Sequence, residues 1–442
     1  MKRKHLRRVE LSPPSILALG FLTLIVIGSS LLLLPIASHS SITLMDALFT
    51  ATSAVTVTGL IVVDTGSDYT IFGQTVIAIL IQFGGLGLMT FAVITIKAIG
   101  GKIGILHQQI AAADFNQTNF STVTSTAKSI LIFALIVESL GMLLLFIRWY
   151  GDMPAGDALF HSFFYAISAF NNAGFALSSK SLMPFVADPV VNIAVTGMFI
   201  VGGLGFVVWI DLYRERTWKK LSIYSRVMIG STVIINVVAM LFIFATEYSN
   251  PATLGSLDMS GKLWASWFQA TTPRTAGFNT LDISSYNDST TTLTILLMFI
   301  GGGSMSTASG IKLMTFVVLI LSTYAYLSKR QEIRLFNRAI PEDTVRKSFA
   351  IGILSMALIW ICLLLLTSTH RINFLDAVFE VVSAFGTVGL SRGATSELNT
   401  FGQLLIMFLM FFGRIGPLTL GYMLATPKRS HIRHPKVDIP VG

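Results

Sequence analysis

The sequence has little charge and almost no cysteine. Of its 442 residues, 12% are Asp, Glu, Lys or Arg, whereas 53% are hydrophobic, and the mean hydropathy is +0.73. A soluble globular protein carries about twice that charged fraction, so the composition indicates a membrane protein with many spanning helices. The single cysteine, Cys362, lies in an apolar run, which excludes a disulfide framework and a cysteine-based metal site.

Other absences narrow the class further. Residues 2–8 resemble the basic start of a signal peptide, but no A-x-A cleavage site follows, so we expect the first apolar segment to be retained. The apolar runs contain no His-Glu pair and no Ser-His-Asp set, and the seven histidines lie mostly outside them, so an enzyme is poorly supported. The net charge of +9 alone would suit nucleic acid, but its distribution follows membrane topology instead.

One short stretch recurs four times. Each copy is a run of small and apolar residues that ends at a glycine followed by an apolar residue, and the glycines are Gly59, Gly174, Gly277 and Gly389. They are 115, 103 and 112 residues apart, a period that indicates four copies of a small domain rather than a solenoid. Aligned without gaps, each copy has an aromatic residue ten positions before the glycine and a hydroxyl six before it: Phe49 and Ser53, Phe164 and Ser168, Trp267 and Thr271, Phe379 and Ser383.

Apolar runs flank each copy. The runs near 16–36, 72–99, 130–147, 190–210, 227–246, 292–324, 349–367 and 401–424 are long enough to cross a bilayer as helices, whereas the glycine stretches are too short. We therefore expect an all-α polytopic membrane protein with four M1–pore loop–M2 repeats, giving eight spanning helices and four re-entrant loops around one central pore. The expected units are residues 16–100, 127–213, 224–328 and 347–426, with termini at 1–15 and 427–442.

Charge sets the orientation. Most of the 31 lysines and arginines lie at the two termini and in the three links between units, which fall on one side if each unit crosses twice. Basic residues collect on the cytoplasmic side, so both termini are expected in the cytoplasm and the glycine loops enter from outside. The outer segments carry more acid than base, which concentrates cations near a pore mouth.

Irregular backbone at membrane depth is tolerated only inside protein or along a water-filled cavity. Four equivalent loops around an axis form a ring of carbonyl oxygens, which can replace the hydration shell of an alkali cation. Glycine suits such a loop because it adopts positive φ without a Cβ clash. The alternative for each glycine alone is close helix packing, but four aligned copies favour the ring.

Small-residue clusters follow each loop by 24 to 28 residues, at Gly84–Gly87, Gly202–Gly205, Gly301–Gly303 and Gly413–Gly416. Close helix packing is the favoured interpretation of the first two. The third continues to Gly310 without helix formers and should break its helix, and it is the only span expected to be broken. It is not a Walker loop, because Ile311 and Lys312 follow Gly310.

The whole chain resembles the Trk/Ktr/HKT superfamily of potassium transporters, in particular the membrane subunit of bacterial Ktr systems. The resemblance rests on Thr-Val-Thr-Gly59-Leu, Phe-Asn-Asn-Ala-Gly174-Phe, Thr-Pro-Arg-Thr-Ala-Gly277-Phe-Asn, Phe-Gly-Thr-Val-Gly389-Leu, the run Gly301 to Lys312, and Gly413-Arg-Ile-Gly-Pro-Leu-Thr-Leu420. It implies a K⁺ filter whose backbone carbonyls hold the ion. The expected filter residues are Thr56, Val57, Thr58 and Gly59; Asn171, Asn172, Ala173 and Gly174; Arg274, Thr275, Ala276 and Gly277; and Gly386, Thr387, Val388 and Gly389.

The resemblance also implies an intramembrane gating loop beneath the filter, made of Gly301, Gly302, Gly303, Ser304, Met305, Ser306, Thr307, Ala308, Ser309 and Gly310. Arg414 lies in the last span, where a charge is expensive and marks a functional site by default. It is expected to face the pore, and a structural salt bridge or carbonyl contact is the alternative. Arg274 is expected to brace its loop rather than touch the ion, and for Glu138 a packing role and a functional role both stay open.

The resemblance implies a homodimer in the bacterial inner membrane, regulated by a cytoplasmic RCK/KTN ring of the KtrA/KtrC type that binds ATP or ADP. The chain itself is expected to hold no cofactor, to bind no nucleic acid and to pass K⁺, with sodium dependence left open. The basic links could contact that ring or simply obey the positive-inside rule. A solute symporter is the first alternative, but such transporters show inverted two-fold repeats with helices broken in paired positions; a scaffold would not explain four re-entrant loops.

Overall fold

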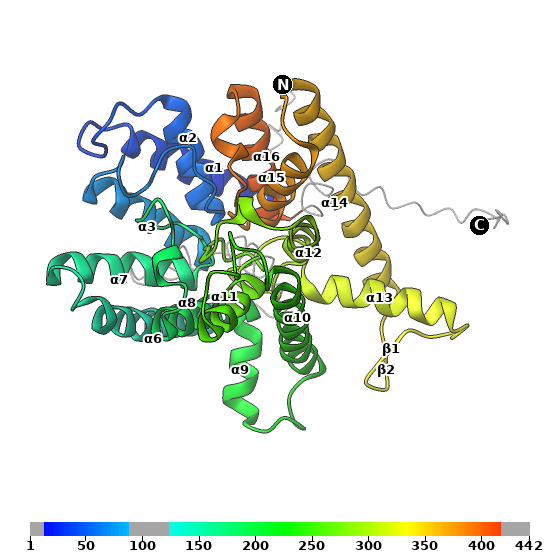
Figure 1. Cartoon of the computed structure of the whole chain (residues 1–442). Coiled ribbons are helices and arrows are strands. Elements are labelled where there is room, and N and C mark those ends of the chain that lie inside the picture. The colour runs from blue at the N-terminus through cyan, green and yellow to red at the C-terminus, as the bar shows by residue number, and fades with distance from the viewer. Residues whose placement is uncertain (1–12, 88–122, 417–442) are drawn as a thin grey trace, which may run out of the picture.

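The computed structural model describes residues 13–87 and 123–416, and these ranges are mostly helical (Figure 1). Both expected cytoplasmic termini, the basic link before the second unit, and the expected ends of the second and last spans lie wholly or partly outside the described residues. The helices are α1 (Pro13–Leu32), α2 (Leu44–Thr56), α3 (Ile71–Leu86), α6 (Val123–Trp149), α7 (Ala155–Phe170), α8 (Pro189–Leu204), α9 (Phe206–Glu215), α10 (Ile223–Glu247), α11 (Met259–Thr271), α12 (Asp288–Phe299), α13 (Leu313–Leu327), α14 (Glu342–Thr369), α15 (Phe374–Gly386) and α16 (Thr400–Ile415). Short 3₁₀ turns at Met183–Phe185, Ile283–Ser285 and Ala394–Glu397, and a hairpin of β1 (Arg334–Leu335) and β2 (Arg338–Ala339), complete the described part.

Four of these helices, within α1, α6, α10 and α14, are long and apolar enough to cross a membrane. Each is the first helix of an expected unit. The pair α8 and α9 would make a fifth span if counted together, and α3, α13 and α16 are shorter apolar helices. Length and composition therefore support a membrane protein with several spanning helices.

The expectation of a single broken span is wrong. The apolar run expected to be continuous over 190–210 bends by 91° between α8 and α9, at Gly205. Gly205 has a φ of 98°, and Gly87 and Gly416 end α3 and α16 with φ of 86° and 95°. Glycine adopts this conformation without a Cβ clash. The last glycine of each of these three small-residue clusters therefore ends a helix, in addition to the packing role expected of the clusters.

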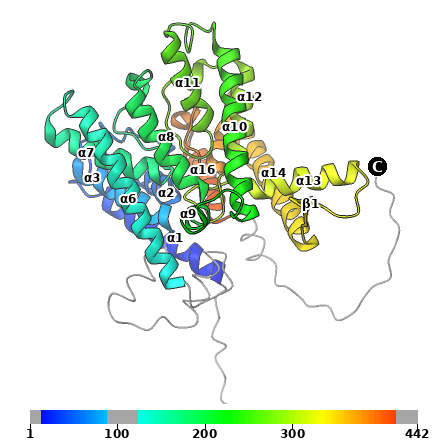
Figure 2. The same ribbon diagram turned by 90° about the horizontal axis from the view of Figure 1, so that it is seen from below.

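The third unit departs from this pattern. Its second helix stops at Phe299, residues 300–312 are irregular, and α13 then begins at Leu313. In both views α13 extends sideways to the edge of the molecule, where it packs against α14 (Figures 1 and 2). The helix is therefore interrupted near Gly301, and α14 then brings the chain back against α15 and α16.

Three of the four short helices, α2, α11 and α15, begin at positions capped by a side chain, whereas α7 begins after Pro154 without such a cap. The N-cap side chain of Thr43 accepts a hydrogen bond from the Asp46 amide at 3.2 Å, and Asp258 and Asn373 accept from the third and second residues of α11 and α15 at 2.9 and 3.0 Å. Such caps satisfy amides at a helix start that have no partner within the helix. They fix where α2, α11 and α15 enter the protein, and therefore where their C-terminal ends arrive.

The four groups of helices follow one another around the middle of the molecule (Figure 1). The second helix of each group packs against the short helix of the next: α3 against α7, α8 against α11, α12 against α15, and α16 against α2. The last of these contacts joins the end of the chain to its beginning. This cyclic packing brings the C-terminal ends of α2, α7, α11 and α15 to one place.

Candidate functional site: a ring of four glycine segments

The segments that follow the short helices share one backbone conformation. In each, φ is positive at the glycine and at the residue two positions earlier. The pairs are Val57 (58°) and Gly59 (93°), Asn172 (60°) and Gly174 (70°), Thr275 (73°) and Gly277 (80°), and Thr387 (47°) and Gly389 (90°). Four segments from different parts of the chain therefore form the same irregular loop.

These four loops contact one another in a closed cycle. A Cβ placed on Gly59 would lie 2.3 Å from the carbonyl oxygen of Ala173, and one on Gly174 would lie 2.8 Å from the Cα of Gly277. The cycle continues from Gly277 to the carbonyl of Val388 at 2.3 Å and from Gly389 to the carbonyl of Thr58 at 2.1 Å. Any side chain at these glycines would collide with the neighbouring loop, which explains why the sequence repeats glycine here.

Hydroxyl groups on the short helices tether the loops. The Ser168 hydroxyl donates to the carbonyl of Phe175 at 2.8 Å, and the Ser383 hydroxyl donates to that of Leu390 at 2.7 Å. Phe175 and Leu390 are the residues that directly follow the ring glycines of their copies. Ser53 instead accepts a hydrogen bond from the Gly59 amide at 3.0 Å. The hydroxyls expected from the repeat pattern therefore contact the loops in three of the four copies.

The third copy is shifted by one residue relative to the gapless alignment. Thr272, not Thr271, donates to the Phe278 carbonyl at 2.6 Å, while the Thr271 hydroxyl bonds to its own helix. The aromatic position shifts too, because Phe268 is fully buried whereas Trp267 is only partly buried. α11 ends six residues before its glycine, against three or four in the other copies, and Pro273 lacks the amide that would continue the helix.

Glycines of the second helices pack on the carbonyl ends of the short helices. A Cβ on Gly84, Gly202 or Gly413 would lie 2.0 Å from the carbonyl of Val55, Phe170 or Phe385 respectively. Each of these carbonyls lies four residues before a ring glycine. The close-packing interpretation of the first two clusters is confirmed, and it extends to the last one.

The irregular segment 300–312 lies against the second unit. The amide of Gly303 donates to the Gly203 carbonyl at 2.9 Å, and the amide of Thr307 donates to Gly202 at 3.2 Å. The Thr307 hydroxyl also lies 2.9 Å from the side-chain amide of Asn172, in the second glycine segment. The segment thus touches both the α8 glycines and the ring.

Arg414 connects this segment to the first unit. Its guanidinium donates to the Thr307 carbonyl and, at 3.1 Å, to the Ser309 hydroxyl; it also donates to the carbonyls of Gly84 and, at 3.0 Å, Gly85. Arginine presents five donors in a fixed fork, so one side chain holds two elements that are far apart in sequence. These carbonyl contacts are compatible with both expectations for Arg414, a position facing the pore and a structural carbonyl contact.

Two residues that contact the segment, Tyr224 and Lys312, were given no role by the sequence. The Tyr224 hydroxyl accepts a hydrogen bond from the Ser304 amide at 2.8 Å, and the Lys312 ammonium donates to the Ala308 carbonyl at 2.7 Å. Lys312 could have been found as a second charge within an apolar run, as Arg414 was. Tyr224 carries no comparable signal, because it lies 80 residues away at the start of α10.

Glu138 belongs to a buried cluster beside the second glycine segment. Gln82 of α3 donates to both of its carboxylate oxygens, at 2.9 and 3.1 Å, and Asn171 donates to it at 3.2 Å. Asn171 also donates to the Gln82 side chain at 2.7 Å. The carboxylate therefore joins α6, α3 and the segment that follows α7, and Gln82 is a partner that the sequence did not indicate.

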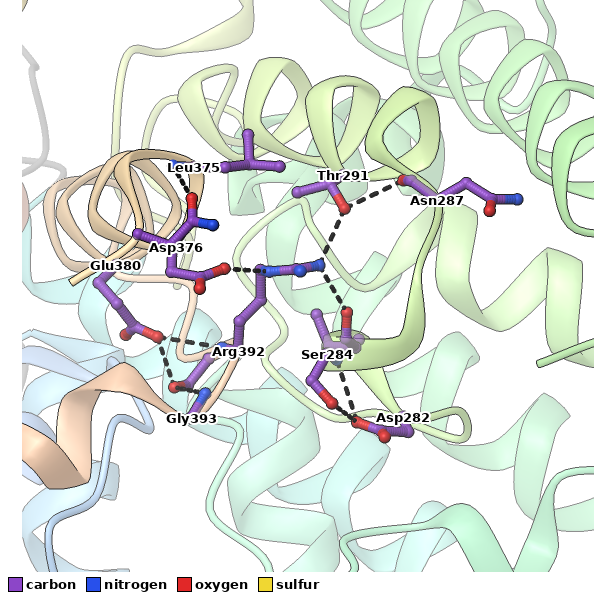
Figure 3. Close-up of polar contacts among 12 residues, drawn as sticks. Asp282, Ser284, Asn287, Thr291, Leu375, Asp376, Glu380, Arg392 and Gly393 are labelled. Atoms are coloured by element: carbon purple, nitrogen blue, oxygen red, sulfur yellow. Dashed lines mark hydrogen bonds and ion pairs between the residues drawn. The ribbon is translucent and has the colours of Figure 1, made fainter. Parts of the chain in front are cut away.

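A second polar cluster fixes the backbone after Gly389. The Arg392 guanidinium bonds to Asp376 of α15 at 2.6 Å and donates to Thr291 of α12 and the Ile283 carbonyl at 3.0 and 3.1 Å (Figure 3). The buried carboxylate of Glu380 accepts from the Arg392 amide at 3.0 Å, on the opposite side of the same backbone (Figure 3). This cluster connects the fourth segment to the third unit and was also missed.

Comparisons with known proteins agree with one another. Residues 12–429 match the profile of the TrkH family, described as cation transport proteins. The chain is 47% identical over 441 residues to Ktr system potassium uptake protein B of Bacillus subtilis, covering 100% of this chain and 99% of that protein. It is 40% identical over 433 residues to the Vibrio alginolyticus protein of the same name, covering 97% and 95%. The crystal structure of the potassium transporter TrkH from Vibrio parahaemolyticus matches the fold with a TM-score of 0.75 at 21% identity, covering 96% and 87% of the two chains.

Proposed function

Because the chain belongs to the TrkH family of cation transport proteins, we propose that it is the ion-translocating subunit of a potassium uptake system. The observation that carries the proposal is the closed cycle of four loops, each with positive φ at its glycine and two residues earlier. Rings of backbone carbonyls replace the hydration shell of an alkali cation. The relatives named as potassium uptake proteins point to K⁺ as the transported ion.

The four expected filter segments, which end at Gly59, Gly174, Gly277 and Gly389, then hold K⁺ at their carbonyls, and the four groups of helices are M1–pore loop–M2 units with eight spans and re-entrant loops. The cyclic packing of each second helix on the next short helix supports this arrangement. The C-terminal ends of the short helices carry partial negative charge, which favours a cation where they converge.

The segment from Gly301 to Gly310 is the proposed gate. Two observations support this role: the backbone of the segment is irregular, and the segment contacts both the ring and α8. Arg414 would hold it shut through the carbonyl hydrogen bonds, raise the barrier to a passing cation, or do both. Opening would require the segment to leave its partners on α8 and Arg414.

The remaining proposals rest on the relatives' names, which describe Ktr systems. A system of more than one component fits a cytoplasmic nucleotide-binding ring that regulates the gate, with ATP or ADP bound there, and a homodimer of this chain. The location would be the bacterial inner membrane, with both termini in the cytoplasm, as the basic links indicate.

The direct test uses the purified full-length chain in lipid vesicles loaded with potassium. We expect a potassium gradient to drive flux that is larger than sodium flux and is stimulated by the cytoplasmic partner. Uptake of an organic solute coupled to a cation gradient, with no potassium flux of its own, would replace this proposal with the symporter alternative.

A further inference from the structure

A pocket of about 20 Å³ lies behind the third glycine segment. It is lined by Phe199, Gly203, Thr232, Asn236, Arg274 and Gly302, among others, and so lies between α8, α10, the end of α11 and the proposed gate. About 10–15 Å³ is enough to hold one water molecule. The pocket therefore has room for one species of roughly water size and none for a phosphate.

Arg274 enters this pocket without a counter-charge. Arg274 is only 9% exposed, and the Nε atom of its guanidinium has no hydrogen-bond partner. None of the ion pairs among residues 13–87 and 123–416 includes it. Arg414 and Arg392, by contrast, each use their guanidinium for several hydrogen bonds.

Two further polar side chains that line the pocket are also unsatisfied. Thr232 Oγ1 and Asn236 Oδ1, both on α10, are buried and have no partner within the described part of the chain. A threonine hydroxyl can donate, and the orientation of an asparagine amide is set by whatever lies beside it. Thr271 also lines the pocket, but its hydroxyl already donates to the carbonyls of Trp267 and Phe268.

We infer that the pocket binds a small monatomic anion of the chloride or bromide class, held by the guanidinium of Arg274 with the Thr232 hydroxyl and the Asn236 amide as further donors. A buried charge without a partner is strongly unfavourable. The C-terminal end of α11 supplies only partial negative charge, and a water molecule would complete hydrogen bonds without neutralising the arginine. An anion does both, and it would shield the proposed ion path from a positive charge three residues before Gly277.

The site can be tested without measuring transport. The full-length protein is purified and crystallised with potassium bromide in place of chloride throughout, so that bromide is the halide present at every stage. We expect an anomalous bromide peak in the pocket, within hydrogen-bonding distance of the Arg274 guanidinium. Density for water alone, or an empty pocket, would overturn the inference.

A solution measurement complements the diffraction experiment. At constant potassium and ionic strength, replacing gluconate with chloride should raise the thermal unfolding midpoint in a saturable way, whereas phosphate should not. Thr232→Val keeps the shape of the side chain and removes one donor, and should weaken the apparent halide affinity about tenfold; Arg274→Gln should abolish the response.

Arg346→Gln is the matched control, because the Arg346 side chain is 77% exposed and remote from the pocket in sequence. It should respond to chloride like the wild type. If Arg274→Gln does not fold, Thr232→Val carries the test. A chloride response that is unchanged in Thr232→Val, together with no bromide in the pocket, would contradict the assignment.

Discussion

At the residue scale, the ring depends on backbone conformations that its own side chains disfavour. Val57, Thr275 and Thr387 are β-branched and yet have φ of 58°, 73° and 47°, a conformation that is a genuine outlier for such residues. Each costs about 1–3 kcal/mol and persists only where the surrounding structure over-determines it. Here the helix hydroxyls and the neighbouring loops supply that constraint, and such strain is typical of functional sites.

The ring glycines give the first prediction. Replacing Gly59, Gly174, Gly277 or Gly389 with serine places a Cβ at positive φ and against the next loop, which displaces the carbonyls. We expect the preference for potassium over sodium to fall about tenfold, equivalent to ~1.4 kcal/mol, in vesicle flux measurements.

Gly197→Ser is the control for that series, because a Cβ at Gly197 of α8 meets nothing within 4 Å. It should keep wild-type selectivity. Wild-type discrimination in all four ring variants would remove the carbonyl ring from the account.

Arg414 gives the second prediction. Arg414→Ala loses the hydrogen bonds to Thr307 and Ser309 as well as the charge, and we expect a higher potassium flux in the absence of the cytoplasmic partner. A cation about 6 Å from the guanidinium is repelled by ~3 kcal/mol at an effective dielectric near 20, so the increase should be large.

Arg414→Lys separates the two contributions, because lysine keeps the charge and loses the fork. Leak through the lysine variant would assign the closed state to the hydrogen bonds, and a closed lysine variant would assign it to charge. Flux at or below the wild-type level in a folded, inserted Arg414→Ala would leave this residue with a packing role.

At the scale of elements, the third unit is the one whose second helix becomes irregular. The segment 300–312 is held by backbone hydrogen bonds to α8 and by the Tyr224 hydroxyl of α10. Small residues with few helix formers have no strong local preference, so these contacts set its position. An element held mainly by polar contacts with its neighbours can change position without unfolding the bundle.

Shortening this segment gives the third prediction. Deleting residues 302–309, or part of that range, should raise potassium flux and weaken its dependence on the cytoplasmic partner, because the obstruction beneath the ring is gone. The measurement is flux with and without the partner, on variants with wild-type thermal unfolding midpoints. Lower flux in a well-folded deletion would make the segment a structural support.

At the scale of the whole molecule, the cyclic packing closes only if neighbouring units stay joined. Arg392 makes one such connection, between Asp376 of the fourth unit and Thr291 and Ile283 of the third (Figure 3). Its side chain is 13% exposed and that of Asp376 is 27% exposed. Breaking an ion pair that is largely buried and shares further hydrogen bonds lowers the stability of the folded protein more than breaking an exposed pair.

This connection gives the fourth prediction. Arg392→Gln should lower the free energy of unfolding by about 2–3 kcal/mol, because it leaves a carboxylate and two acceptors without their donor. Arg346→Gln removes an exposed pair with Glu342, whose side chains are 77% and 84% exposed, and should cost less than about 1 kcal/mol. Equal effects in urea unfolding would show that the Arg392 cluster is not a stabilising connection.

Local pattern was enough to place the four short helices, the ring glycines and the break near Gly301, because each depends on residues close in sequence. The bend at Gly205 was missed because a glycine within an apolar run is equally consistent with close packing. The one-residue shift at Thr272 and Phe268 was missed because a gapless alignment cannot register it. Contacts such as Tyr224 with Ser304, or Gln82 with Glu138, join distant segments and depend on tertiary packing that no local pattern encodes.

The central claim is that the four glycine segments bind a potassium-sized cation between them. The most direct measurement is the anomalous diffraction of crystals grown with rubidium, which resembles potassium in size and charge. We expect a rubidium peak on the axis enclosed by Gly59, Gly174, Gly277 and Gly389. A ring without bound rubidium, with the ion found elsewhere in the protein, would contradict it.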